Sequence, residues 1–207
     1  MKWWLRTELP EFQISNFKNG AIYYLWGYPY RLIIRRDGNY IKTQEQNLIF
    51  STTSKNTKEE NRNILLLWYK NILTNETLKM KDEIELKIGV KANYYDVKKL
   101  RGYNCWGTCN IEKRIINIDR RLVLFKSEAL EHIIIHELLH LIIKEHNKEF
   151  YALEKKYCPN KDIIGFCLAR KIADYRYYDW SNFRVAKRFE HGLVEYCKIY
   201  NIKEEIL

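Results

Sequence analysis

The sequence predicts an α+β protein in which a small N-terminal antiparallel β-sheet precedes an α/β core and C-terminal helices. Short segments rich in aromatic and β-branched residues support the sheet at 21–26, 30–34, 40–41 and 47–51. Asp37-Gly38-Asn39 has the composition of a hairpin turn. From residue 58 onward, apolar residues recur at helical spacing instead.

The remaining elements follow from periodicity and from residues that end helices. Helices are predicted at 58–73 and 78–88, and Gly89 would end the second. Strands at 97–100 and 115–118 bracket an unusual loop at 102–109. We therefore divide the chain into an N-terminal β-sheet region at 1–57, a central core at 58–160 and a C-terminal helical extension at 161–207.

The second half of the chain is predicted to be mainly helical. Ser127 can cap a helix whose first turn contains Glu128 and Glu131, because acidic side chains are favourable there. After a break at Cys158-Pro159-Asn160, two more helices are expected at 163–178 and 182–200.

Composition limits the classes of protein that the chain can represent. With 207 residues, of which 46% are hydrophobic, it can bury the core of one compact domain or of two small ones. No apolar run approaches the ~20 residues of a membrane span, and the first six residues contain too short an apolar segment for a secretory signal. We expect a cytoplasmic protein that does not associate with membranes.

The five cysteines are odd in number and do not have the paired spacing of a zinc ribbon. They are expected to be reduced. Cys105 and Cys109 could supply soft metal ligands, but small buried side chains are the simpler interpretation.

The formal charge of +10 is compatible with an anionic partner such as a nucleic acid, a nucleotide or an acidic protein. Because lysines are spread along the whole chain, solvated surfaces explain the charge equally simply. An aromatic and basic cluster at 175–180 could stack on a base or a peptide, although helix packing is the commoner use of such residues.

The most informative motif is His136-Glu137-x-x-His140. Residues four apart on a helix lie on one face, so the two imidazoles can hold one metal ion. A neighbouring carboxylate can then take the proton from a water molecule bound to that metal. This pattern predicts a catalytic Zn²⁺ site with Glu137 as the general base.

A catalytic zinc usually has three protein ligands and one open position. His146 is the best third candidate, and Glu149 and Glu154 are the alternatives. His146 would point away from His140 if the helix continued, so the helix must end first, near 144–147. Asn147 can then cap a second helix. Ile143 stands where the metzincin pattern has a glycine, which argues against that class.

Three sets of residues resemble the YgjP-type zinc metallopeptidase family, whose members are minimal zincins. They are the loop Trp106-Gly107-Thr108-Cys109, the segment 116–122 that ends in Arg120-Arg121-Leu122, and the motif from His136 through His146 to Phe150. Tyr24-Leu25-Trp26-Gly27, Tyr30-Arg31-Leu32 and Leu67-Trp68-Tyr69 extend the resemblance upstream. It covers roughly residues 20–159.

The resemblance implies a zincin-like core, His136, His140 and His146 as zinc ligands, and Glu137 as the catalytic base. Cys105 stands where the family has a basic residue, and Asp119 where it has asparagine. If these residues contact substrate, the change of charge would disfavour anionic groups. An edge strand near the metal could also pair with an extended substrate.

The leading functional hypothesis is hydrolysis of a peptide bond in a peptide or protein substrate. Trp106, Gly107, Cys109, Arg120 and Tyr151 are predicted to bind substrate, and Arg120, Tyr151 and Tyr157 are candidates for stabilising the oxyanion. The alternatives are hydrolysis of a nucleotide phosphoanhydride, a SprT-like protease acting near DNA, and a binding module whose metal site is closed by Cys105 or Cys109.

Overall fold

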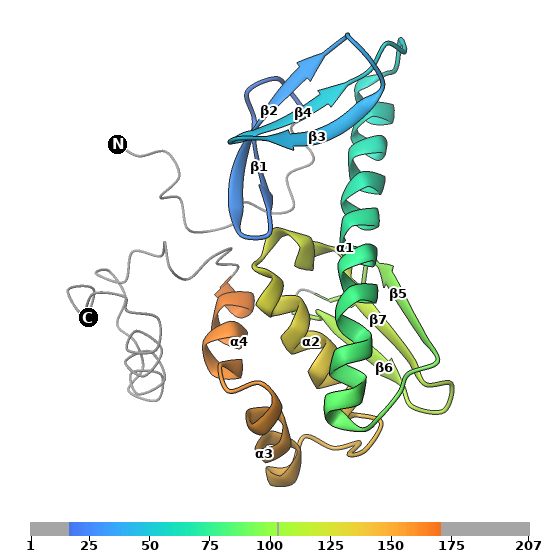
Figure 1. Ribbon diagram of the computed structural model, residues 1–207, viewed down its shortest axis with the longest axis vertical. Helices are drawn as coiled ribbons and strands as arrows, with labels where there is room; N and C mark the ends of the chain where they lie inside the picture. Colours follow the sequence, from blue (N-terminus) through green and yellow to red (C-terminus); the bar gives the residue numbers. More distant parts are fainter. Residues whose placement is uncertain (1–16, 103, 171–207) are drawn as a thin grey trace, which may run out of the picture.

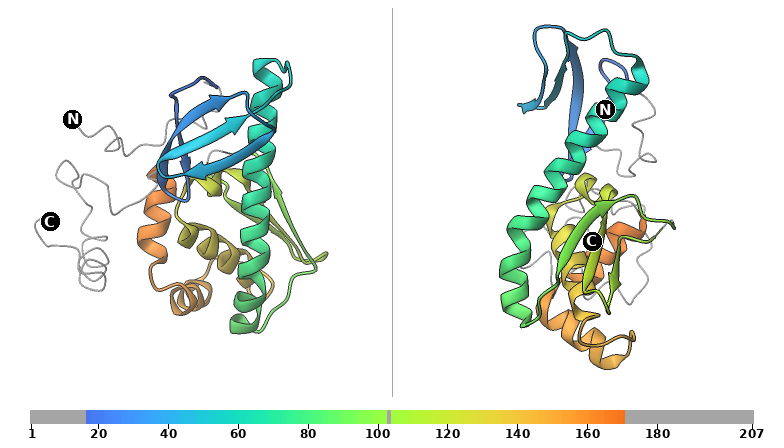
Figure 2. Two further views of the ribbon diagram at one scale, coloured as in Figure 1. Left: turned by 45° about the horizontal axis from the view of Figure 1, so that its top comes forward. Right: turned by 90° about the vertical axis from the view of Figure 1, so that its right-hand side faces the viewer.

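The computed structural model describes residues 17–102 and 104–170 (Figure 1). It has the expected α+β composition, with a four-stranded sheet at one end of a long helix and a three-stranded sheet with further helices at the other (Figures 1 and 2). Within the described ranges, no helix is both long and apolar enough to cross a bilayer. The cluster at 175–180, the helix expected at 182–200 and the end of the helix expected at 163–178 lie outside the described residues.

The N-terminal sheet forms where strands were predicted. Its strands are β1 (Ile22–Leu25), β2 (Tyr28–Arg35), β3 (Tyr40–Gln44) and β4 (Asn47–Ser51). Trp26 and Gly27 both have positive φ angles and make the β1–β2 turn, so Tyr28 and Pro29 already belong to β2. This turn is held against the core because the Trp26 and Gly27 amides donate to the Val123 and Leu124 carbonyls.

The expectation of a purely antiparallel sheet was wrong. The strand order is β1-β2-β4-β3, and β2 pairs with β4 in parallel. The reason is burial: β4 is almost entirely buried and takes a central position, whereas the more polar β3 lies at the edge. Asp37-Gly38-Asn39 therefore joins two strands that are not neighbours. Ser51 at the end of β4 fastens this turn, with its hydroxyl 2.6 Å from the Asp37 carboxylate.

One helix, α1 (Lys58–Ile88), replaces the two helices predicted at 58–73 and 78–88. The intervening residues 74–77 include no glycine or proline, and the buried Thr77 hydroxyl donates to the Leu73 carbonyl of the preceding turn. Thr57 and Glu60 form a capping box at its start. Gly89 ends it in the left-handed conformation, as predicted.

The second sheet has the order β5-β7-β6, formed by β5 (Tyr94–Lys98), β6 (Gly107–Asn110) and β7 (Ile115–Asp119). β5 is parallel to β7, and β6 is antiparallel to it. β5 begins three residues earlier than expected, and the end of the predicted loop at 102–109 forms β6. This strand lies at an edge of the sheet.

Four helical segments complete the described fold: a 3₁₀ helix at Arg120–Leu124, α2 (Ser127–Leu139), α3 (Lys148–Tyr157) and α4 (Lys161–Arg170). α2 contacts α1 on one side and α3 and α4 on the other, and it also contacts β6 and β7 (Figure 1). Lys126, rather than Ser127, is the N-cap residue of α2, and it makes no side-chain capping bond. The predicted cap was therefore wrong by one residue.

Candidate metal centre

Helix α2 places two of the three candidate histidines. Most of its residues are apolar and buried, so the helix is held inside the protein and only part of its surface is accessible. His136 and His140 lie one helical turn apart, with ring centroids separated by 5.0 Å. Both side chains are half-buried.

The chain must leave the helix before His146 can join this pair, and it does so earlier than expected. α2 ends at Leu139, His140 is its C-cap residue, and a turn follows instead of the predicted stop near 144–147. Asn147 caps α3 as predicted, accepting a hydrogen bond of 2.9 Å from the Phe150 amide. This connection returns His146 to the two rings of α2.

The three histidines form a group that can hold a metal ion, because one ring nitrogen from each lies within 4.8 Å of the others. The Nε2 atoms of His136 and His146 are 3.0 Å apart. Two zinc-bound nitrogens in a tetrahedral site are separated by about 3.3 Å. Two nitrogen lone pairs at this distance repel unless a proton or a cation lies between them. The donor set therefore fits a cation such as Zn²⁺.

In two of the three rings, the Nδ1 nitrogen has a hydrogen-bond partner, which favours metal binding by the other ring nitrogen. His136 Nδ1 lies 2.6 Å from Glu154 Oε1, and His140 Nδ1 lies 3.3 Å from the Ile143 carbonyl oxygen. If each Nδ1 carries the proton, each Nε2 presents a lone pair towards the centre of the group. Burial, together with the neighbouring His136, lowers the pKa of His140, and so favours the neutral form of that ring.

Glu154 is the residue whose role the sequence did not identify. We considered it as an alternative third ligand, but it lies behind His136 and also accepts a hydrogen bond of 2.9 Å from Lys161. Burial would raise the pKa of Glu154, yet the hydrogen bonds from His136 and Lys161 outweigh burial and lower it to about 2. Only the packing of α3 on α2 reveals this contact. Glu149, the other alternative, is exposed.

Glu137 follows His136 directly in α2 and is buried, with 5% of its surface exposed. Burial raises the pKa of its carboxyl to about 7, and the nearby His136 opposes this effect in part. A carboxyl group with such a pKa can both accept and release a proton near neutral pH.

Strand β6 approaches this carboxyl group closely at Gly107. A Cβ atom on Gly107 would lie 2.6 Å from Glu137 Oε1 and 2.7 Å from Ile133 Cγ2. Only glycine fits without a displacement. The end of the loop predicted at 102–109, which forms β6, is thus brought directly beside the candidate base.

The other predicted substrate residues have different surroundings. Trp106 is 7% exposed and packs edge-to-face on Phe125. Cys109 is half-buried, and burial and the Glu137 charge raise its pKa to about 11. Tyr151 is exposed and stacks on the His146 ring at 6.1 Å. Arg120 lines a separate basic cavity. Contact of these residues and Gly107 with substrate stays a prediction.

Asp119 is buried and does not present its charge at the surface, so the condition for its expected effect on substrate preference is not met. It is fully buried, and its carboxylate accepts hydrogen bonds from the Leu100 amide at 2.8 Å and the Arg121 Nε at 2.6 Å. The Arg121 guanidinium also lies 4.5 Å from the Trp106 ring centroid. This pair therefore holds the loop that precedes β6.

The cysteines in the described part of the chain are all free thiols, in agreement with the sequence interpretation. Cys158 and Cys167 are buried, and Cys105 and Cys109 are half-buried. Among the described residues, neither Cys105 nor Cys109 joins the three histidines. The described donor set thus leaves the coordination sphere incomplete, as a catalytic site requires.

Comparison with known proteins identifies one family. The model of the family described as YgjP-like, metallopeptidase domain, matches residues 2–168. The match extends well beyond the resemblance seen at 20–159 and includes all three histidines and Glu137. Comparisons with curated proteins and with solved structures find no match.

Proposed function

The chain belongs to the YgjP-like metallopeptidase domain family, which implies a hydrolase, and from this premise we propose that it is a zinc-dependent peptidase. The observation that carries the proposal is the meeting of three histidine nitrogens within 4.8 Å beside a buried glutamate. His136, His140 and His146 would hold the ion. When bound, zinc would acidify a water molecule and polarise the scissile carbonyl group.

In this proposal Glu137 moves the proton. Its carboxylate accepts a proton from the attacking water and later gives that proton to the departing amine nitrogen. Burial supports both steps, because it raises the pKa of Glu137 to about 7 and so makes the two protonation states similar in free energy near neutral pH. Glu154 orients the His136 ring and does not itself react.

The substrate would bind as an extended strand beside β6. This strand is at the edge of its sheet, and its first residue, Gly107, contacts Glu137. Main-chain hydrogen bonds to an edge strand are a common way to hold an extended peptide. Tyr151 is the best placed of the three candidates for stabilising the oxyanion, because its ring stacks on His146.

The test is the Glu137→Gln variant, assayed on casein with zinc content measured in the same samples. Gln retains the size of the side chain but cannot accept the proton, so activity should fall by about 10²- to 10⁴-fold while zinc stays bound. Glu83→Gln, an exposed change on α1, is the matched control and should retain activity. Undiminished hydrolysis by Glu137→Gln would refute the assignment of the base.

A further inference from the structure

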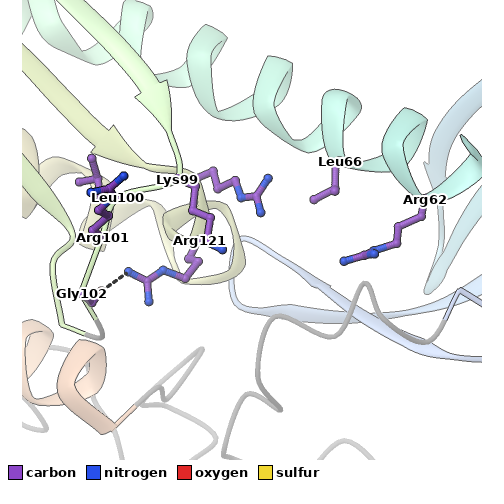
Figure 3. A pocket seen from close by; sticks show the side chains of 8 residues that line it. Arg62, Leu66, Lys99, Leu100, Arg101, Gly102 and Arg121 are labelled. Atoms are coloured by element: carbon purple, nitrogen blue, oxygen red, sulfur yellow. Dashed lines mark hydrogen bonds between the residues drawn. The ribbon is translucent and has the colours of Figure 1, made fainter. Parts of the chain in front are cut away.

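A cavity lies away from the three histidines, between α1 and the segments that follow β5 and β7. Its volume is about 660 Å³. Helix α1 supplies one wall, and the segments 99–102 and 120–121 supply the other (Figure 3). The lining residues are Arg62, Leu66, Lys99, Leu100, Arg101, Gly102, Arg120 and Arg121. Five of these side chains are cationic and none is acidic.

Part of this charge is neutralised nearby. Arg121 pairs with the buried Asp119, and Arg62 lies 3.1 Å from the exposed Glu59. Within the described part of the chain, no carboxylate lies within ion-pair distance of Lys99 or Arg101. The wall that carries the cations is firmly built, since Arg121 donates to the Cys105 carbonyl at 2.9 Å and Asp119 accepts from the Leu100 amide. Cations held this close together repel each other, and an anion would relieve the repulsion.

Arg62 also lacks a partner for part of its guanidinium group. The side chain extends from α1 into the space that faces Arg121 (Figure 3). Its Nε is shielded from solvent and has no hydrogen-bond acceptor among the described residues. Because the Nε itself is shielded, the oxygen atoms of a ligand would be met by the terminal N–H groups of this guanidinium.

The chemistry of the lining indicates which anion fits. Arginine forks match the oxygen pairs of phosphate groups, and several such forks around one cavity suit several phosphates. The described lining offers no aromatic ring on which a base could stack and no amide side chain that could read one. A ligand recognised here is thus bound through its phosphates and not through its bases.

We propose that this cavity binds the phosphate backbone of a single-stranded nucleic acid without sequence preference. A flexible single strand can bring successive phosphates to the cationic wall. The net charge of +10 on the whole chain would attract the strand from a distance. None of the three histidines lines the cavity, so the inference goes beyond the proposed peptidase activity and does not depend on it.

The experiment measures binding of a fluorescent dT₁₂ strand to the full chain by anisotropy at several salt concentrations. The test variant replaces Arg62, Lys99 and Arg101 by Gln, which leaves the Arg121–Asp119 pair intact. The matched control replaces Lys42, Lys70 and Lys79 by Gln: these three exposed lysines lie outside the cavity, and the change in net charge is identical. Unchanged zinc content and circular dichroism would show that both variants fold.

We expect the cavity variant to bind at least ten-fold more weakly than the natural chain, and the control to bind within two-fold of it. The plot of log affinity against log salt should lose about two units of slope in the cavity variant, because three phosphate contacts are removed. A dA₁₂ strand should bind as well as dT₁₂. Equal weakening in both variants, or undetectable binding by the natural chain at low salt, would overturn the proposal.

Discussion

Buried polar side chains determine how the histidines of the candidate metal centre are oriented. His136 is held by Glu154, which is itself held by Lys161. The spacing of the three histidines was readable in the sequence because it depends on one helix and the turn that follows it. The partner of His136 was not, because Glu154 reaches it only through the packing of α3 on α2. A carboxylate 18 residues away carries no local signal of such a contact.

Glu154→Gln should weaken zinc binding by about 10- to 100-fold, since a neutral amide can still accept from His136 but no longer raises the basicity of the ring. The measurement is competition with a chelator of known zinc affinity. Lys155→Gln, an exposed change on the same helix, is the control. Unaltered affinity would mean that the backbone alone orients His136.

His132 makes stability depend on pH. Its Nδ1 is buried and has no hydrogen-bond partner among the described residues, and burial lowers its pKa to about 4. The unfolded chain would take up the proton near pH 6.5. The stabilisation linked to the neutral ring is therefore complete above pH 6.5 and is lost as the pH falls towards 4, at a cost of about 3 kcal/mol.

The comparison is urea unfolding of the natural chain and of His132→Leu at pH 7 and pH 4, both in the presence of a chelator. The variant should lose about 3 kcal/mol less of its free energy of unfolding between these two pH values. An identical loss in both proteins would assign the acid sensitivity to other groups.

Secondary structure was predicted best where the local pattern decides it. All four N-terminal strands, the Gly89 end of α1 and the Asn147 cap of α3 follow from residue type alone. The pairing of β2 with β4 could not be predicted this way, because it depends on which strand buries both faces. Likewise, the residue types of β6, which has the sequence Gly-Thr-Cys-Asn, do not by themselves indicate a strand. This strand forms because β7 and α2 lie beside it.

The close approach of β6 to α2 leads to a specific prediction. Gly107→Ala should lower peptidase activity by about 10²-fold, because the new methyl group displaces either the strand or the Glu137 carboxyl, while zinc binding by the histidines persists. Gly165→Ala in α4 is the control, since a Cβ there meets nothing within 4 Å. That change should raise stability by ~0.5–1 kcal/mol. Full activity of Gly107→Ala would remove β6 from the site.

At the scale of the whole molecule, the two sheets are connected by α1, which at 31 residues is about 46 Å long. In the first half of this helix, the Tyr69 hydroxyl donates a hydrogen bond to the Tyr24 carbonyl of β1. Near its end, the Glu85 carboxylate accepts one from the Tyr95 hydroxyl of β5. The boundary predicted at residue 57 coincides with the start of this helix, but the division into three domains stays a prediction.

Metal binding should stabilise the whole chain. If zinc binds only the folded state, a free concentration one hundred times the dissociation constant contributes about 2.7 kcal/mol. For a chain of this size, removal of zinc by a chelator should lower the melting temperature by roughly 5–10 °C. In His146→Ala, whose changed side chain is exposed, the chelator should have little effect. A large chelator effect in that variant would place the ion elsewhere.

The shortness of β6 has a consequence for what the proposed enzyme would cut. Four residues of edge strand offer main-chain partners over only ~13 Å of an incoming polypeptide. An edge strand this short binds the backbone of any extended, accessible segment and selects little for the side chains of that segment. We expect cleavage to begin at frayed or unfolded stretches of a protein and to spare the same stretches once they are folded.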